Sequence, residues 1–220
     1  MLKLYHNPIS GNSRRVWIAL LEKEIPFEEI VVKLDGDQLT PEFLEISPFH
    51  HIPVLVDDDF TLVESLAILD YLETEYSQNP LLPTEAKALA TVRMVEMVTV
   101  NELSPILTRL SSEMMGFTKE PQKLEQAKQK AHTVLKFFES LLGERPYFSS
   151  NCLTRADIVA GTIVPWLPSL GLPLDNYPKL SAWIERLVQR ETWQKTQPSQ
   201  EALEAFIPQW ETLMKAYLPQ

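Results

Sequence analysis

The stretch that decides the fold runs from residue 51 to residue 76 and reads HIPVLVDDDFTLVESLAILDYLETEY. Residues 54–56 predict a short β-strand, and Pro53 suits its first position because proline has no N–H to donate to a sheet. The Ile52–Pro53 bond at this bend is a candidate cis peptide. A cis bond would turn the N–H and C=O of Ile52 outward, so we expect a strand-like docking edge for a peptide here.

The second half of this stretch gathers polar groups at the start of a helix. An aspartate turn at 57–59 joins the strand 54–56 to a second strand, 60–63, as a hairpin. Glu64 and Ser65 then precede a helical pattern. The apolar residues of that pattern are Leu66, Ile68, Leu69 and Leu72. A carboxylate, a hydroxyl and free helix N–H groups converge at this point, which favours a zwitterionic ligand.

Composition excludes several classes of function. The 220 residues include 30 acidic and 20 basic side chains, so we expect the surface to repel nucleic acid. No apolar run approaches the roughly 20 residues that a membrane span needs. The N-terminus lacks the pattern of a signal peptide, so we expect neither a membrane partner nor export. The single cysteine, Cys152, excludes an internal disulfide and fits a reducing, cytoplasmic location.

The first part of the chain alternates strand and helix patterns. Residues 3–6 predict a strand, 13–23 a helix and 27–32 a second strand. Thr40 followed by Pro41 predicts the start of a short helix. With the hairpin and the helix after it, the predicted order is βαβα followed by ββα.

A proline-rich linker separates this part from a purely helical one. Pro80 and Pro83 disfavour helix in the segment 79–84. The helical patterns beyond it cover, in order, 85–115 with a candidate kink at Pro105, then 122–142, 155–164, 179–190 and 199–216. We therefore expect an all-α second domain.

The residues around Thr154 predict how one of these helices begins. The Thr154 hydroxyl is placed to accept from the N–H of Asp157, and the Asp157 carboxylate to accept from the N–H of Thr154. This capping box is interpreted as a folding device, and losing Thr154 should cost about 1 kcal/mol or more.

Together these patterns resemble a known family. Residues 51–76 are similar to the glutathione-binding half of the soluble glutathione S-transferases. LTRADIVAG at 153–161 and NYPKLSAWIERL at 176–187 are similar to their helical half. The resemblance implies an α/β plus all-α architecture. The implied parts are a thioredoxin-like domain at 1–78, a linker at 79–84 and an all-helical glutathione transferase domain at 85–220.

Ser10 is the candidate catalytic residue that the resemblance implies. In the serine-type classes, which include phi, theta and zeta, a serine five positions before Arg-Val donates a hydrogen bond to the glutathione sulfur. Ser10 has this spacing from Arg15-Val16. Two alternatives stay open: Ser13 could meet the sulfur instead, or either serine could only cap the helix. A tyrosine mechanism is disfavoured because His6 stands at the tyrosine position, and a cysteine mechanism because positions 10 and 12 hold serine and asparagine.

The resemblance also implies the rest of a glutathione site. The backbone of Ile52, held by Pro53, would pair with the cysteinyl part, and Glu64 with Ser65 would hold the γ-glutamyl end. The candidates for the glycine carboxylate are Gln38 and His51. The neighbouring histidines at 50 and 51 have no acid or cysteine at ligand spacing, so no metal is expected.

The function implied is a glutathione S-transferase that conjugates reduced glutathione, as co-substrate, to a small electrophile. Two alternatives remain: a non-enzymatic binding or regulatory protein of the same fold, and a glutathione-dependent isomerase or dehalogenase. Phe49 lies where several classes carry an aromatic key, so a homodimer is expected. The sequence assigns neither the acceptor pocket nor its substrate.

Overall fold

The computed structural model describes residues 1–117 and 119–206 and divides the chain into two compact units. Unit 1 comprises Met1–Asn79 together with the described chain from Thr192, and unit 2 comprises Pro80–Glu191. From the sequence we expected everything beyond residue 85 in one helical domain. In this division the described residues 192–206 group with the first unit, and the domain bounds expected from the sequence stay a prediction.

A four-stranded sheet forms the centre of unit 1, in the order β2-β1-β3-β4. Its strands are β1 (Leu2–His6), β2 (Glu28–Val31), β3 (Val54–Asp57) and β4 (Phe60–Leu62). Strand β1 is parallel to β2 and antiparallel to β3, and β3 is antiparallel to β4. The predicted hairpin is confirmed, because Asp57 lies opposite Phe60 across a two-residue turn.

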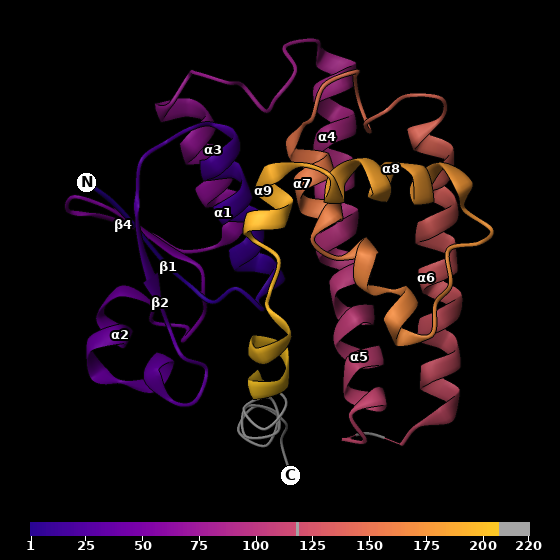
Figure 1. Ribbon diagram of the computed structural model, residues 1–220, viewed down its shortest axis with the longest axis horizontal. Coiled ribbons are helices and arrows are strands. Elements are labelled where there is room, and N and C mark those ends of the chain that lie inside the picture. Colours follow the sequence, from indigo (N-terminus) through magenta and orange to yellow (C-terminus); the bar gives the residue numbers. More distant parts are fainter. Residues whose placement is uncertain (118, 207–220) are drawn as a thin grey trace. The chain divides into compact units, whose positions relative to one another are not determined.

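Three α-helices accompany this sheet, and they are drawn in indigo to purple in Figure 1. They are α1 (Gly11–Glu22), α2 (Pro41–Ile46) and α3 (Ser65–Glu75). Helix α1 begins earlier than the sequence pattern indicated, because Ser10 is its N-cap and accepts from the N–H of Ser13. Helix α2 begins as predicted, with Thr40 as N-cap and Pro41 in the first turn.

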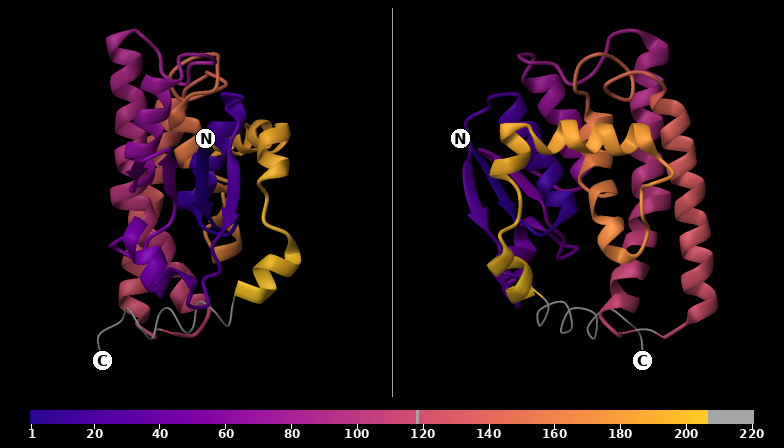
Figure 2. Two further views of the ribbon diagram at one scale, coloured as in Figure 1. Left: turned by 90° about the vertical axis from the view of Figure 1, so that its left-hand side faces the viewer. Right: turned by 45° about the vertical axis from the view of Figure 1, so that its right-hand side comes forward.

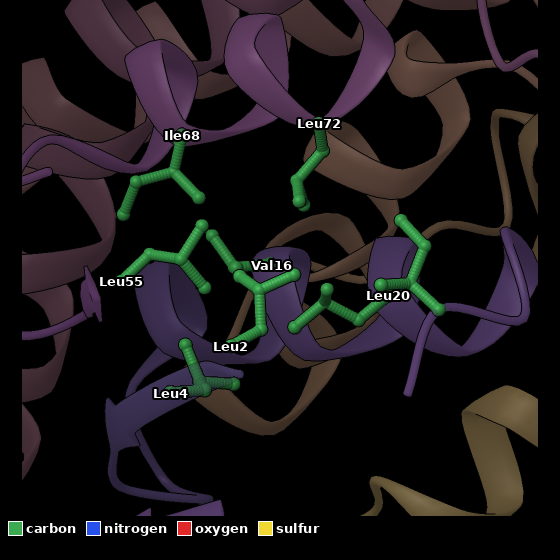
Figure 3. Packing of buried hydrophobic residues seen from close by; sticks show 8 residues of the cluster. Leu2, Leu4, Val16, Leu20, Leu55, Ile68 and Leu72 are labelled. Atoms are coloured by element: carbon green, nitrogen blue, oxygen red, sulfur yellow. The ribbon is translucent and has the colours of Figure 1, made fainter. Parts of the chain in front are cut away.

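The two faces of the sheet carry separate apolar clusters. Helices α1 and α3 cover one face, where leucine, isoleucine and valine side chains from β1, β3 and both helices point toward one another (Figure 3). That cluster consists of Leu2, Leu4, Val16, Leu20, Ile25, Leu55, Ile68 and Leu72. On the other face of the sheet, Phe43 of α2 packs with Val32 and Val54 in a second cluster. Each fully buried aliphatic side chain contributes roughly 2 kcal/mol, so these clusters fix the strands that carry the site.

Unit 2 is helical, as predicted. Its helices are α4 (Ala86–Val98), α5 (Ser104–Met114), α6 (Pro121–Leu142), α7 (Arg155–Gly161) and α8 (Pro178–Val188), and α9 (Glu191–Lys195) follows at the boundary between the units. Helices α5 and α6 pack side by side, as the views of Figure 2 also show. The predicted kink near Pro105 takes the form of a π-helical turn at Thr99–Leu103, directly before α5. A proline cannot donate to the preceding turn, so the widened ladder falls just ahead of it.

The capping box at the start of α7 is confirmed. Oδ2 of Asp157 accepts from the N–H of Thr154 at 2.9 Å and from its hydroxyl at 2.7 Å. Oδ1 accepts from the N–H of Phe148 and from Nε1 of Trp183, both at 3.0 Å. Burial raises the pKa of Asp157 while these four bonds favour its charged form.

The last predicted helix, 199–216, is described only in part. Residues 200–206 are helical, and the remainder of that prediction lies outside the described residues. Within the described part of the chain, no helix is both long and apolar enough to cross a membrane.

Candidate functional site

A cavity of about 300 Å³ lies in unit 1, around the N-terminal end of β3. Its lining residues are Asn12, Leu34, Gln38, His50, His51, Ile52, Pro53, Glu64 and Ser65. They come from the first turn of α1, the chain after β2, the loop before β3 and the start of α3. The structure thus brings together the binding residues that the resemblance implied, in a volume at the lower end of the range for small-molecule sites.

The loop before β3 is held by one buried serine. The Ser47 hydroxyl donates to the C=O of His51 at 2.8 Å and accepts from its N–H at 3.1 Å. The Ile52–Pro53 peptide bond is cis, as the sequence indicated. Within the described residues, the N–H and C=O of Ile52 have no hydrogen-bond partner, and Ile52 lines the cavity. An extended ligand could therefore pair with this backbone as a strand would.

Gln38 and His50 form the cavity wall on another side. Gln38 is only 2% exposed, and its backbone C=O lies 3.2 Å from Nδ1 of His50. Its side-chain oxygen has no partner among the described residues. A buried polar atom without a partner is costly, so this amide is suited to meet a polar ligand or a bound water. His50, considered from the sequence only as a rejected metal ligand, is part of the lining.

Glu64 and Ser65 stand at the N-terminus of α3. Glu64 has a φ of 68°, an uncommon value for a residue with a side chain, and its carboxylate is exposed. Ser65 is buried, and its hydroxyl accepts from Nη1 of Arg15 at 3.4 Å. The positive end of the α3 dipole and the Arg15 guanidinium favour an anion, while the Glu64 carboxylate favours a cation. The two charges of a zwitterion fit this arrangement.

The serines before and inside α1 differ in what they contact. The Ser10 hydroxyl accepts from the N–H of Ser13 at 3.2 Å. Ser13 is fully buried, and its hydroxyl accepts from the N–H of Asn7 at 3.4 Å. Neither serine lines the cavity, whereas Asn12 between them does. Capping leaves the Ser10 proton available, because a hydroxyl accepts and donates at once.

The site and fold together define a class of protein. A thioredoxin-like unit whose cavity carries groups that suit a zwitterion, joined to a helical unit, is typical of glutathione-dependent proteins. Two family models match the chain: glutathione S-transferase, N-terminal domain, over residues 4–80, and glutathione S-transferase, C-terminal domain, over residues 102–191.

Similar proteins support the same placement. Glutathione S-transferase F6 of Arabidopsis thaliana is 33% identical over 206 residues, which cover 88% of this chain and 98% of that protein. Glutathione S-transferase F7 of the same plant is 32% identical over 206 residues, with the same two shares. The chain belongs to the glutathione S-transferase family and is similar to its plant phi class.

Solved structures agree. Glutathione transferase F7 of Populus trichocarpa has a TM-score of 0.78 at 26% identity, covering 89% of this chain and 97% of that one. Human glutathione transferase theta-2, solved in complex with glutathione, has a TM-score of 0.78 at 27% identity, covering 100% and 93%. A maleylacetoacetate isomerase of Methylobacterium extorquens, solved with malonate and glutathione, has a TM-score of 0.76 at 30% identity, covering 89% and 96%.

Proposed function

We propose that this protein conjugates reduced glutathione to small electrophiles through a thiolate stabilised by Ser10. The observation that carries the proposal is the cavity, in which an unpaired backbone edge at Ile52 lies with the Glu64–Ser65 pair. A γ-glutamyl peptide offers matching groups: a zwitterionic end for the pair and an extended middle for the edge. Membership of the glutathione S-transferase family supports the choice of glutathione.

The glycine end of glutathione is proposed to meet Gln38 and His51. Both line the cavity, and both carry side-chain N–H donors for a carboxylate. Turning the Gln38 amide would exchange its unpartnered oxygen for its NH₂ group, so the same side chain serves as donor. The three parts of the ligand are then each met by a different segment of unit 1.

The proposed chemistry is activation of the glutathione thiol. Lowering a thiol pKa from about 8.5 by about two units requires about 2.7 kcal/mol of preferential stabilisation of the anion. A hydrogen bond to a charged group contributes about 1.5–3 kcal/mol, and a helix N-terminus adds about 0.3–1 kcal/mol. Ser10 at the N-cap of α1 offers both. The thiol proton leaves to solvent, the sulfur bonds to the electrophilic carbon, and the leaving group departs with its electron pair.

A second candidate function is a glutathione-dependent isomerase. It is favoured by the likeness, at 30% identity, to a maleylacetoacetate isomerase solved with glutathione. In that case the sulfur would add to a double bond and leave again after rotation, so the same thiolate would serve. A regulatory protein without catalysis needs no such thiolate, and nothing in the cavity favours it over the two enzymes.

One experiment separates these functions. Purified protein is titrated with glutathione in a calorimeter and then assayed with aryl halides, isothiocyanates and a cis-configured unsaturated diacid. We expect binding and conjugation. Isomerisation without conjugation would establish the second function, and binding without either reaction would indicate a regulatory protein. Absence of glutathione binding would overturn all three.

We further propose a homodimer in which Phe49 is the inserted aromatic side chain. Phe49 is 57% exposed, which is unusual for a phenylalanine, and lies in the loop next to the cavity.

The reducing, cytoplasmic location expected from the single cysteine stays a prediction.

A further inference from the structure

The cavity wall contributed by α1 consists of one residue, Asn12. The two nearby serines do not line the cavity: the Ser10 hydroxyl accepts from the N–H of Ser13, and Ser13 is buried with its hydroxyl accepting from the N–H of Asn7. Asn12 itself is exposed, and its side chain has no hydrogen-bond partner within the described residues. The amide is therefore available to whatever enters the cavity.

Helix stability does not explain asparagine at this position. Ser10 already supplies the cap of α1. Asn12 is the second residue of α1 and makes no hydrogen bond to the helix backbone within the described residues, so it adds no cap of its own. An unpaired asparagine in a capped helix, facing a ligand cavity, points instead to a role toward the ligand.

The electrostatics at this point suit an anion. Asn12 lies in the first turn of α1, where free N–H groups and the positive end of the helix dipole are found, and that turn contains no acidic residue. A carboxamide offers two N–H donors. Donors that are already in place stabilise a developing anion without having to reorganise as it forms.

We propose that Asn12 is a second ligand of the glutathione thiolate, its side-chain amide donating to the sulfur alongside Ser10. This inference rests on the proposed function, because it places glutathione in the cavity. With Ile52 pairing the cysteinyl backbone, the cysteinyl side chain lies in the same cavity that Asn12 lines. Asn12 is then a catalytic residue, and the anion is held by two donors rather than one.

The test measures the pKa of the bound thiol from the ultraviolet absorbance of the thiolate, in a pH titration with saturating glutathione. We expect Asn12→Ala to raise this pKa by about one pH unit, which corresponds to about 1.4 kcal/mol. Asn12→Asp keeps the shape but replaces the donors with a negative charge, so it should raise the pKa further. The double variant Ser10→Ala/Asn12→Ala should bring the thiol close to its free value of about 8.5.

The matched control is Gln38→Ala, which removes a cavity-lining carboxamide proposed to meet the glycine end. It should weaken glutathione binding and leave the thiol pKa where it is in the wild type. If wild-type protein binds glutathione with a lowered thiol pKa that Asn12→Ala and Asn12→Asp leave unchanged, the inference is wrong and the proposed function stands. If wild-type protein does not bind glutathione, both are wrong.

Discussion

The Ser10 hydroxyl accepts from the N–H of Ser13 and keeps its own proton for a ligand. We expect Ser10→Ala to retain most of the glutathione affinity, because the other contacts lie elsewhere, and to raise the bound thiol pKa. Turnover at neutral pH should fall ten- to a hundredfold, for a loss of about 1.5–3 kcal/mol. The deficit should shrink as rising pH ionises the thiol, which a pH profile of the conjugation rate will measure.

Ser13→Ala is the matched control for this prediction. Ser13 is buried and bonded to Asn7, so its loss should reduce stability and leave the thiolate in place. A larger loss of turnover in Ser13→Ala than in Ser10→Ala would transfer the role to Ser13. Equal pH profiles of Ser10→Ala and the wild type would exclude Ser10.

Glu64 supplies the negative charge for the proposed γ-glutamyl ammonium. Glu64→Gln preserves the size of the side chain and its unusual φ but removes the charge. We expect glutathione affinity to fall about tenfold or more, measured by calorimetry, because an ammonium would lose its charged partner. Glu42→Gln, at an exposed glutamate outside the cavity lining, should leave the affinity unchanged. An unaltered affinity in Glu64→Gln would refute this placement of the ligand.

At the residue scale, the sequence predicts the contiguous part of the site better than the rest. Ile52, Pro53, Glu64 and Ser65 sit in one stretch whose turn and helix signals are local. Asn12 joins them only through the packing of α1 beside α3, and a lone asparagine carries no signal of that contact. The roles of these residues toward glutathione remain predictions.

Among the elements, α1 holds the segment 192–197 through Arg14, a contact that the sequence did not predict. Arg14 is 3% exposed, and it donates to the Thr196 hydroxyl at 3.2 Å, to the C=O of Trp193 at 3.1 Å and to Oε1 of Gln197 at 3.0 Å. Thr192 also bonds to Glu22 of α1. Burial lowers the pKa of Arg14 to about 10, so it stays charged at neutral pH. These bonds explain why residues 192–197 group with unit 1.

We expect Arg14→Met to release the segment 192–197. Three acceptors would lose one donor group, so amide hydrogen exchange in this segment should accelerate about tenfold or more, and the free energy of unfolding should fall by roughly 2 kcal/mol. Arg14→Lys should rescue little, because one ammonium cannot reproduce the guanidinium fork. Arg145→Met, at an exposed arginine, serves as control. Unchanged exchange at 192–197 would contradict this role of Arg14.

Element order and type follow from the sequence pattern more closely than element ends do. The strands, the capping box and the proline starts are set by neighbours in the chain. The start of α1 depends on a serine whose capping geometry the apolar spacing does not encode. The π-turn at Thr99–Leu103 depends on how the hydrogen bonds of the helix adapt to Pro105. Apolar periodicity indicates the region where the helix is disturbed, but not which residues form the turn.

For the whole molecule, buried His6 makes stability depend on pH. Its ring is inaccessible to solvent and packs against Trp17, and burial lowers its pKa from 6.5 to about 4. The Glu29 carboxylate lies 3.5 Å from Nε2, but it is 44% exposed and does not offset the burial. Between these two values the unfolded chain binds more protons than the folded one, so stability falls as pH decreases.

We expect His6 to account for a loss of roughly 3 kcal/mol in the free energy of unfolding as pH falls from about 6.5 to about 4. His6→Phe, which keeps a ring against Trp17, should be less sensitive to acid. Urea titrations of both proteins at neutral pH and at pH about 5 isolate the effect, because the carboxylates contribute equally to both. Parallel pH dependences in the two proteins would show that folded His6 titrates normally.

The proposed homodimer is the last prediction. We expect the wild type to sediment as a dimer at micromolar concentration, and Phe49→Ala to weaken association at least tenfold, because a central aromatic anchor typically contributes about 2 kcal/mol or more. Phe60→Ala is the control, since Phe60 is similarly exposed, at 50%, in the same unit. A monomeric wild type would rule out the dimer, and a dimer untouched by Phe49→Ala would rule out Phe49 as its anchor.

The two hydrogen bonds between the Ser47 hydroxyl and the His51 backbone have a consequence for how sequences of this family diverge. Because the Ser47 hydroxyl fixes both backbone groups of His51 and the ring of Pro48 restricts its own φ, the path of the chain into the cavity is set independently of the side chain of Phe49. Phe49 is exposed. Mutation there is expected to be nearly neutral for the ligand. Descendants of one ancestral gene could therefore drift apart in the partner they pair with while inheriting the same co-substrate.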